Sequence, residues 1–341
     1  MPTRRRIVKA LPLLLLASGP KAQAPRTGPP KRVGVLNFGN DPGAEARKSA
    51  ASSADWEALR LKGWTLGQNL LVERVYANGN KERLRQLAEA LVHKRVDVIL
   101  AFGPSEAVAA ARATRTIPIL FADSYFPIEQ GLIDSYARPG RNVTGFALFV
   151  ELDMSHKRLE YLREIVPDAK RLAWLSLGGR TFSAETVSGG RFDAIPLRDA
   201  AAKTLGFEAR FYTLQSPAEI EVVFRDLVSW RAQAIAVGGE LFEPRQVVAD
   251  LALRHRLPGA FGFSEHVDAG GLLSYTMLDT PETDARRFAE YLDSLLRGTR
   301  PADLPVEGPD LFELVINMKT ANALGLTVPK SLQLRADRII R

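Results

Sequence analysis

The chain has 341 residues, of which 46% are hydrophobic and 25% charged, a composition typical of globular proteins. At about 150 residues a domain, this length predicts two domains. Cysteine is absent, which excludes disulfides, thiolate metal sites, a cysteine nucleophile and the cysteine of a lipid anchor. The formal net charge of +7 would favour a nucleic-acid partner only if the basic residues lay on a folded domain.

The first 24 residues are typical of a secretory signal peptide. Residues 4–6 are all arginine, residues 7–17 form an apolar stretch, and small residues lie near position 24. The apolar stretch is far shorter than the ~20 residues of a membrane span. We therefore expect a periplasmic protein, exported by the Sec route in preference to the twin-arginine route. The segment holds five basic and no acidic residues, so its removal lowers the net charge from +7 to +2, and we expect no nucleic-acid partner.

Residues 97–124 predict a βαβ unit. An apolar run at 98–102 stops at Gly103, and a second apolar run follows at 119–122. Ser105 stands where the N-cap of the intervening alanine-rich helix is expected. Such units are right-handed and pair their strands in parallel, so the strand carboxyl ends meet at one edge of the sheet.

The same alternation of strands and helices continues along the chain after a proline- and glycine-rich linker at 25–30. Strands are predicted at residues 32–37, 69–78, 98–102, 119–122, 143–147, 171–176, 208–212, 234–237, 260–263 and 272–277. Helices are predicted at residues 44–62, 81–94, 107–113, 153–166, 197–205, 217–230, 241–256 and 281–296. Residues 178–190 are predicted to be a loop rich in glycine and serine. Two such series of alternating elements predict an α/β fold with two Rossmann-like lobes and parallel sheets.

The pattern restarts after Gly145, which predicts lobes that are discontinuous in sequence. We expect lobe one to comprise residues 31–145 and 277–325, since the segment at 311–324 is expected to return to it. Lobe two is expected to comprise residues 146–276, and residues 326–341 to form a C-terminal tail.

Several turn motifs, taken together in their order and spacing, resemble those of one family. They are Gly67-Gln68-Asn69, Arg138-Pro139-Gly140-Arg141-Asn142, Gly270-Gly271-Leu272-Leu273-Ser274-Tyr275, Pro301-Ala302-Asp303-Leu304-Pro305 and Ala323-Leu324-Gly325-Leu326-Thr327. The chain is similar to ABC transporter substrate-binding proteins of the tryptophan/tyrosine-binding type over roughly residues 31–341. The resemblance implies a type I periplasmic-binding-protein architecture with hinge crossovers that closes on a small solute. It also implies an inner-membrane ABC permease as partner. Ser264 stands near an expected arginine, a departure that affects the ligand more than the fold.

In open parallel sheets, ligands bind at the carboxyl ends of the strands. Nine residues at or near predicted strand ends are therefore our candidate ligand-binding residues: Phe38, Ser105, Ser124, Tyr125, Ser176, Glu240, Phe263, Ser264 and Tyr275. We expect Ser105 and Ser124 to donate to a ligand carboxylate beside a helix N-terminus, and Glu240 to pair with an ammonium group. The alternatives are a simple cap for Ser105, a solvated first-turn acid for Glu240, and core packing for strand-end aromatics such as Phe102.

We expect a binding protein and no enzyme, with no catalytic residue, metal or cofactor. Neither a Walker A run nor a dinucleotide fingerprint follows a strand, and the histidine spacing does not resemble a zinc site. The expected function is the solute-binding component of an ABC importer, a monomer that binds a small carboxylate-bearing solute such as an amino acid. Two alternatives remain open: a sensor that presents its ligand to a membrane receptor, and a serine hydrolase. The hydrolase would use Ser105, although Ala107 replaces the second glycine of its G-x-S-x-G motif.

Overall fold

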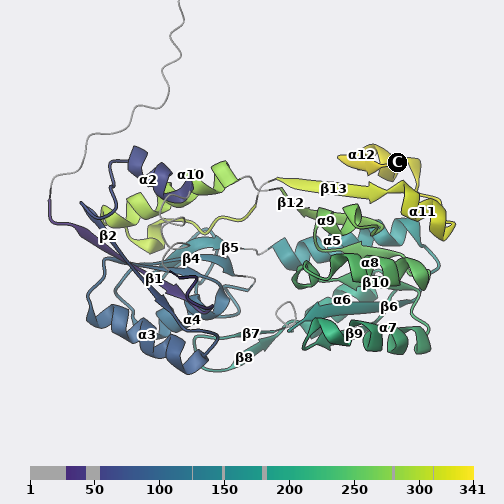
Figure 1. Cartoon of the computed structure of the whole chain (residues 1–341), viewed down its shortest axis with the longest axis horizontal. Coiled ribbons are helices and arrows are strands. Elements are labelled where there is room, and N and C mark those ends of the chain that lie inside the picture. Colours follow the sequence, from purple (N-terminus) through teal and green to yellow (C-terminus); the bar gives the residue numbers. More distant parts are fainter. Residues whose placement is uncertain are drawn as a thin grey trace, which may run out of the picture.

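The computed structural model describes residues 28–43, 54–124, 126–147, 150–178, 183–278, 281–309 and 311–341. Figure 1 shows two α/β lobes side by side, each built on one sheet. The expected signal peptide, residues 1–24, lies outside the described residues. Within the described ranges, no helix combines the length and the apolar character needed to cross a bilayer.

Lobe one is built on a five-stranded, all-parallel sheet of order β2-β1-β3-β4-β5. Its strands are β1 (Lys31–Asn37), β2 (Leu70–Tyr76), β3 (Val98–Phe102), β4 (Ile119–Ser124) and β5 (Val143–Ala147). One face is covered by α3 (Lys81–His93) and α4 (Pro104–Ala113), the other by α2 (Ala54–Leu61) and α10 (Pro281–Leu296). The strand order reverses direction between β1 and β3, which makes their carboxyl ends the topological switch point of this lobe.

The core of lobe one lies on both faces of the sheet. Val33 and Val35 pack towards α2 and α10, whereas Leu36 packs in the cluster under α3 and α4. A strand that is buried on both faces carries a continuous apolar run without alternation. This burial explains why the strands were recognisable as unbroken apolar runs in the sequence.

Lobe two is built on a seven-stranded sheet of order β14-β13-β12-β11-β10-β6-β9, in which every pair is parallel except β12 with β13. Its strands are β6 (Arg171–Leu177), β9 (Glu208–Leu214), β10 (Ala234–Val237), β11 (Gly259–Phe261), β12 (Leu273–Met277), β13 (Phe312–Asn317) and β14 (Arg338–Ile340). Its helices are α5 (Val150–Ile165), α6 (Ile195–Thr204), α7 (Ile220–Ser229), α8 (Arg245–Arg254), α9 (Ser264–Asp268), α11 (Met318–Leu324) and α12 (Lys330–Arg335). Strands β9-β6-β10-β11-β12 repeat the order of lobe one, so a second switch point lies between β6 and β10.

The C-terminal part of the chain departs from the sequence-based boundary, which assigned residues 277–325 to lobe one and 326–341 to a tail. Helix α10 does pack on lobe one, where the rings of Trp56 and Phe288 meet at 6.3 Å. Strand β13, however, pairs antiparallel with β12, and β14 pairs with β13. The segment therefore belongs to the sheet of lobe two, because its pairing partner is decided by tertiary packing and not by its own pattern.

The predicted loop at 178–190 also differs from expectation, because part of it pairs. Strands β7 (Ser183–Glu185) and β8 (Arg191–Asp193) form an antiparallel hairpin. Its turn is closed by the Thr186 N–H, which donates to the Gly190 carbonyl at 3.0 Å. Gly189 takes a φ of +99°, which an L side chain rarely adopts. Strands of three residues are too short to show alternation, so composition alone predicted a loop.

A buried hydrogen bond joins the two chain segments of lobe one. The Trp64 indole Nε1–H donates to Asp293 Oδ1 at 2.8 Å, across 229 residues of sequence. Arg297 Nε–H donates to the same oxygen at 2.9 Å. Asp293 is 8% exposed, so its carboxylate is shielded from water.

Replacing Asp293 with alanine should lower the free energy of unfolding by ~1–3 kcal/mol, because the buried Trp64 indole loses its acceptor. Urea denaturation followed by Trp fluorescence measures this change. Asp293→Asn keeps an acceptor oxygen and should lose less. The matched control Asp303→Ala removes an acid that is 48% exposed. Equal losses for Asp293→Ala and Asp303→Ala would contradict the structural role of this bond.

Candidate functional site

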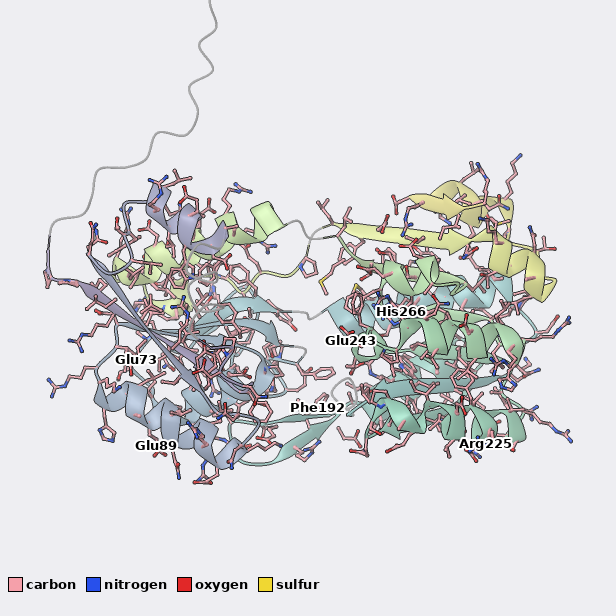
Figure 2. All side chains as sticks on the ribbon, in the orientation of Figure 1. Glu73, Glu89, Phe192, Arg225, Glu243 and His266 are labelled. Atoms are coloured by element: carbon pink, nitrogen blue, oxygen red, sulfur yellow. The ribbon has the colours of Figure 1, made fainter. Side chains whose placement is uncertain are left out.

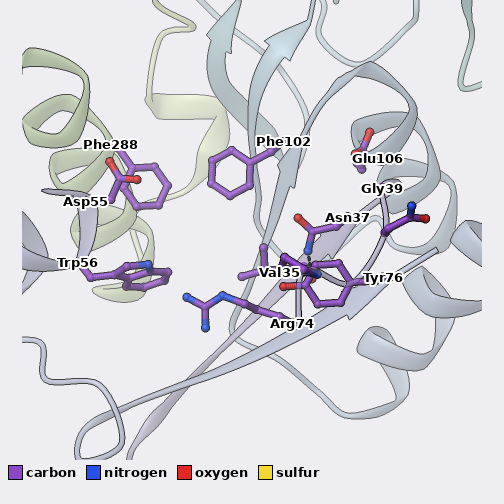
Figure 3. A pocket seen from close by; sticks show the side chains of 12 residues that line it. Val35, Asn37, Gly39, Asp55, Trp56, Arg74, Tyr76, Phe102, Glu106 and Phe288 are labelled. Atoms are coloured by element: carbon purple, nitrogen blue, oxygen red, sulfur yellow. Dashed lines mark hydrogen bonds between the residues drawn. The ribbon is translucent and has the colours of Figure 1, made fainter. Parts of the chain in front are cut away.

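A cavity of about 550 Å³ opens at the switch point of lobe one (Figure 3). It lies where the carboxyl ends of β1 and β3 meet the helices α2 and α10. The lining includes Asn37, Asp55, Trp56, Arg74, Phe102 and Phe288. The doubly wound topology places these side chains together, since ligands of open α/β sheets bind outside the carboxyl ends at the switch point.

Three aromatic side chains form the apolar wall of this cavity. Trp56 and Phe288 meet edge to face at 6.3 Å, and Phe102 lies 6.0 Å from Phe288 in a tilted arrangement. Phe102 is 40% exposed, although it follows directly on buried strand residues. An exposed phenylalanine beside other rings offers a surface on which a flat apolar group can stack.

Charged groups of both signs line the same cavity. The Arg74 guanidinium lies 5.3 Å from the centroid of the Trp56 ring, a cation–π contact that directs it into the cavity (Figure 3). Partial burial raises the pKa of Asp55 above its ordinary value. The buried Glu106 accepts a hydrogen bond from the Phe38 backbone N–H at 2.9 Å. The cavity therefore combines aromatic surface with a cation and carboxylates.

The two serines of lobe one that we singled out lie away from this cavity. Ser105 is not the N-cap of α4, because Gly103 takes that position with a φ of +137° and Pro104 follows at the first helical position. Ser105 instead lines a second cavity of about 200 Å³ between α3, α4 and Glu185. Ser124 is fully buried, and its hydroxyl donates to Gln130 Oε1 at 2.6 Å.

Phe38, the remaining described candidate of lobe one, does not line the first cavity, although its backbone N–H donates to the lining residue Glu106. Its ring is half-buried against the core under α3 and α4. The candidate Tyr125 lies outside the described residues.

In lobe two the structure brings two of the candidates together at the second switch point. Ser176 lies near the end of β6, and its hydroxyl donates to Glu240 Oε1 at 3.2 Å. Glu240 belongs to the short helix η2 (Gly239–Leu241), which directly follows β10. A Cβ on Gly262 would come within 2.6 Å of the Gly239 nitrogen, so this loop packs closely against the one that carries Glu240.

The other two strand-end candidates of lobe two start a helix that we did not predict. Phe263 is the N-cap residue of α9, and Ser264 is its first residue. The Phe263 ring lies edge to face with Phe242 at 5.9 Å and stacks with His266 at 6.3 Å. The Ser264 hydroxyl is within 3.4 Å of Glu265 Oε2 at the surface.

Tyr275 lies apart from the other candidates. Its ring meets Tyr161 edge to face at 5.5 Å and stacks on Phe312 at 5.5 Å, against the core of lobe two. Burial raises the pKa of Tyr275 above its ordinary value. The ring therefore stabilises the pair β12–β13.

The sequence analysis missed the lining of this cavity, since none of the twelve lining residues was among the nine candidates. Trp56 and Asp55 fall inside a predicted helix, where an aromatic residue is usually part of the core. Arg74 lies two residues before the observed end of β2 but four residues before the end that was predicted for this strand, so it was not counted as a strand-end residue. Phe288 had no local signal, because α10 reaches this site from the opposite end of the chain.

Among the described side chains, no cluster of three or more histidine, cysteine, aspartate or glutamate residues is placed to hold a metal ion. His266 is fully buried, and this burial lowers its pKa to about 4. The imidazole is therefore neutral in the folded protein at neutral pH.

This neutral histidine should make the protein less stable in acid. The unfolded chain takes up a proton near pH 6.5 but the folded one only near pH 4, so stability is unaffected above pH 6.5 and falls as the pH drops between these values. The loss at pH 4 should be ~3 kcal/mol, by the conversion of pKa difference into free energy.

Urea titrations at pH 7, 5 and 4 measure this loss, and His266→Phe should remove most of it. The exposed His93 provides the matched control, since His93→Gln should keep the pH dependence of the unchanged protein. Parallel pH profiles for the unchanged protein and His266→Phe would rule out this source of acid sensitivity.

Three known proteins are similar to this chain, one by sequence and two by structure. A curated relative, the tyrosine-binding protein of Clostridioides difficile (strain R20291), is 25% identical over 311 residues, covering 91% of this chain and 84% of the relative. A Streptococcus pneumonia ABC domain in complex with L-Trp superimposes with a TM-score of 0.68 at 22% identity, covering 91% of this chain and 100% of the other. A ligand-free, open substrate-binding protein with adhesive properties from Clostridium difficile superimposes with a TM-score of 0.61 at 22% identity, covering 91% of this chain and 99% of the other.

The structural likeness confirms the expected fold, the two-lobed α/β architecture of type I periplasmic binding proteins. The family itself is given by sequence, since the family model described as ABC transporter substrate binding protein matches residues 33–340. The match covers nearly the whole of both lobes. The chain therefore belongs to the ABC transporter substrate-binding protein family, a class of proteins that bind solutes and catalyse no reaction.

Proposed function

We propose that this protein binds an aromatic amino acid between its lobes and delivers it to the permease of an ABC importer. The observation that carries the proposal is the cavity at the lobe-one switch point, which joins Arg74, Asp55 and three aromatic rings in one space. The names of relatives point the same way, since one binds tyrosine and another holds L-Trp. Because the family is not enzymatic, the hydrolase alternative built on Ser105 is set aside.

Each group of the ligand would find a matching group in this cavity. The ligand carboxylate would pair with the Arg74 guanidinium, whose planar fork suits two carboxylate oxygens. The ligand ammonium would approach Asp55 or Glu106, and its ring would stack on Phe102. The carboxylate that we expected from the sequence is thus retained, but Arg74 replaces Ser105 and Ser124 as its anchor.

Lobe two would complete the site when the lobes close. Glu240 and Ser176 stand at the equivalent switch point, and Glu243, just beyond Glu240, lies on the side of lobe two that faces lobe one (Figure 2). Closure would exclude water, which strengthens each polar contact with the ligand. Such hinge closure of two lobes around a ligand is a known switching motion.

The cellular setting belongs to the same proposal. Residues 1–24 would direct export through the Sec route, and the protein would act in the periplasm as a monomer, with the membrane permease as partner and no nucleic acid. The sensor alternative predicts binding without transport. Uptake of radiolabelled tryptophan by cells that lack the gene decides between the two, since only the transport function predicts reduced uptake.

Replacing Arg74 with glutamine should weaken the binding of tryptophan by about 10-fold or more, because a charge-assisted hydrogen bond is worth ~1.5–3 kcal/mol. Tryptamine lacks the carboxylate and should bind Arg74→Gln as it binds the unchanged protein. Isothermal titration calorimetry with both compounds gives this comparison. Arg83→Gln, an exposed arginine on α3, is the matched control. Equal weakening for both compounds would disprove the carboxylate contact.

Truncating Phe102 to alanine should reduce affinity for tyrosine and tryptophan by ~3–10-fold. This is the contribution that a stacked aromatic pair makes in addition to the burial of its apolar surface. The fold should be unaffected, because the side chain is already 40% exposed. The matched control is Phe312→Ala in lobe two, which lies outside the cavity. If calorimetry gives both variants the affinity of the unchanged protein, Phe102 has no part in the site.

A further inference from the structure

The hairpin β7–β8 is an insertion in lobe two that contacts lobe one. Its strands lie between β6 and α6 in sequence, yet Figure 1 shows them reaching from lobe two to α4 of lobe one. We call residues 183–193 the strap. Phe192 of the strap lies in the space between the two lobes (Figure 2).

The strap is held on lobe one by a buried glutamine. The Val187 N–H of the strap donates to the Gln130 backbone carbonyl at 2.7 Å, and Gln130 Nε2–H donates to the Glu185 carbonyl at 3.1 Å. Gln130 is 1% exposed, and its Oε1 accepts the hydrogen bond from Ser124. Ser124 therefore orients the amide so that its N–H groups face the strap.

Side chains at the surface add to this attachment. Arg112 of α4 donates to the Thr186 carbonyl at 2.6 Å and to the Val187 carbonyl at 3.2 Å. Lys81 forms an ion pair with Glu185 of the strap. Lobe one thus supplies donors to the carbonyl groups of residues 185–187 and an acceptor to the Val187 N–H of the strap.

The ring of Phe192 packs against Phe126 of lobe one, with centroids 5.0 Å apart. Phe192 lies on β8, whereas Glu185 lies on β7. Both strands of the strap are therefore fixed to lobe one.

The C-terminal end of the strap is joined to lobe two by a very short connection. Only Ala194, which is fully buried, separates β8 from α6. Helix α6 is in turn anchored in lobe two, where the buried Arg198 donates to Ser155 Oγ of α5 at 2.8 Å. One residue spans at most ~3.6 Å of extended chain, so separation of the lobes soon pulls on this junction.

We propose that the strap limits how far the two lobes open. Figure 1 shows it joining the lobes at the bottom of the view, whereas β12 and β13 approach α10 at the top. Connections at both ends of the molecule restrict the lobes to rotation and oppose wide separation. Release of the strap from lobe one then allows a wider open state. This inference concerns the unliganded protein and does not depend on which solute it binds.

Pulsed dipolar spectroscopy between spin labels on the two lobes tests this directly. Because the chain has no cysteine, Glu89→Cys on α3 and Arg225→Cys on α7 give two specific labelling sites, both exposed. The labelled protein is compared with Lys81→Ala/Arg112→Ala and with Phe192→Ala, all without solute. Arg115→Ala, an exposed arginine just beyond α4 and outside the strap contacts, is the matched control.

In both strap variants we expect the mean distance between the two spin labels to increase by ~3 Å or more, about the length of one extended residue. The distribution of this distance should also broaden. The control should keep the distances of the unchanged protein. Circular dichroism melts verify that each variant is folded. Two independent variants are used so that the test still stands if one of them does not fold. Unchanged distances in the folded strap variants would overturn the proposal. Because no solute is present, that result would leave the proposed aromatic amino acid ligand untouched.

Discussion

Parallel strand pairing is the constraint on which the rest of this protein depends. Right-handed crossovers place the carboxyl ends of the five consecutive parallel strands of each lobe, and the starts of the helices that follow them, on one edge of the sheet. In both lobes the order of the five parallel strands reverses between the first and third of them, so each lobe has one crevice at that edge. The cavity beside Phe102 and the Ser176–Glu240 pair occupy these two equivalent places.

Carboxylates at the two switch points are held in similar ways. Glu106 follows β3 and accepts a hydrogen bond from the loop after β1, while Glu240 follows β10 and accepts one from β6. Each acid lies in the first turn of a helix, where exposed N–H groups favour negative charge. The two lobes thus share the same strand order and the same placement of a carboxylate at the switch point. Lobe one also has the aromatic wall and Arg74.

The connections between the lobes matter as much as the lobes themselves. The chain leaves lobe one after β5, returns as α10 and leaves again into β13, so neither lobe is one continuous segment. The strap adds a further contact at the opposite end of the molecule. The function that we propose involves motion between the lobes, and we propose the strap as the limit on that motion.

Local pattern in the sequence was sufficient to predict the two α/β lobes and the strand ends near which Ser176 and Glu240 lie. Apolar runs, amphipathic helices and turn residues act over a few residues, and they can be read directly from the chain. The sequence alone did not reveal that β13 pairs with β12, that residues 183–193 cross to lobe one, or that Phe288 completes the cavity beside Trp56. Tertiary structure decided these features, because contacts such as Trp64 with Asp293, 229 residues apart, depend on the path of the whole chain and leave no local pattern.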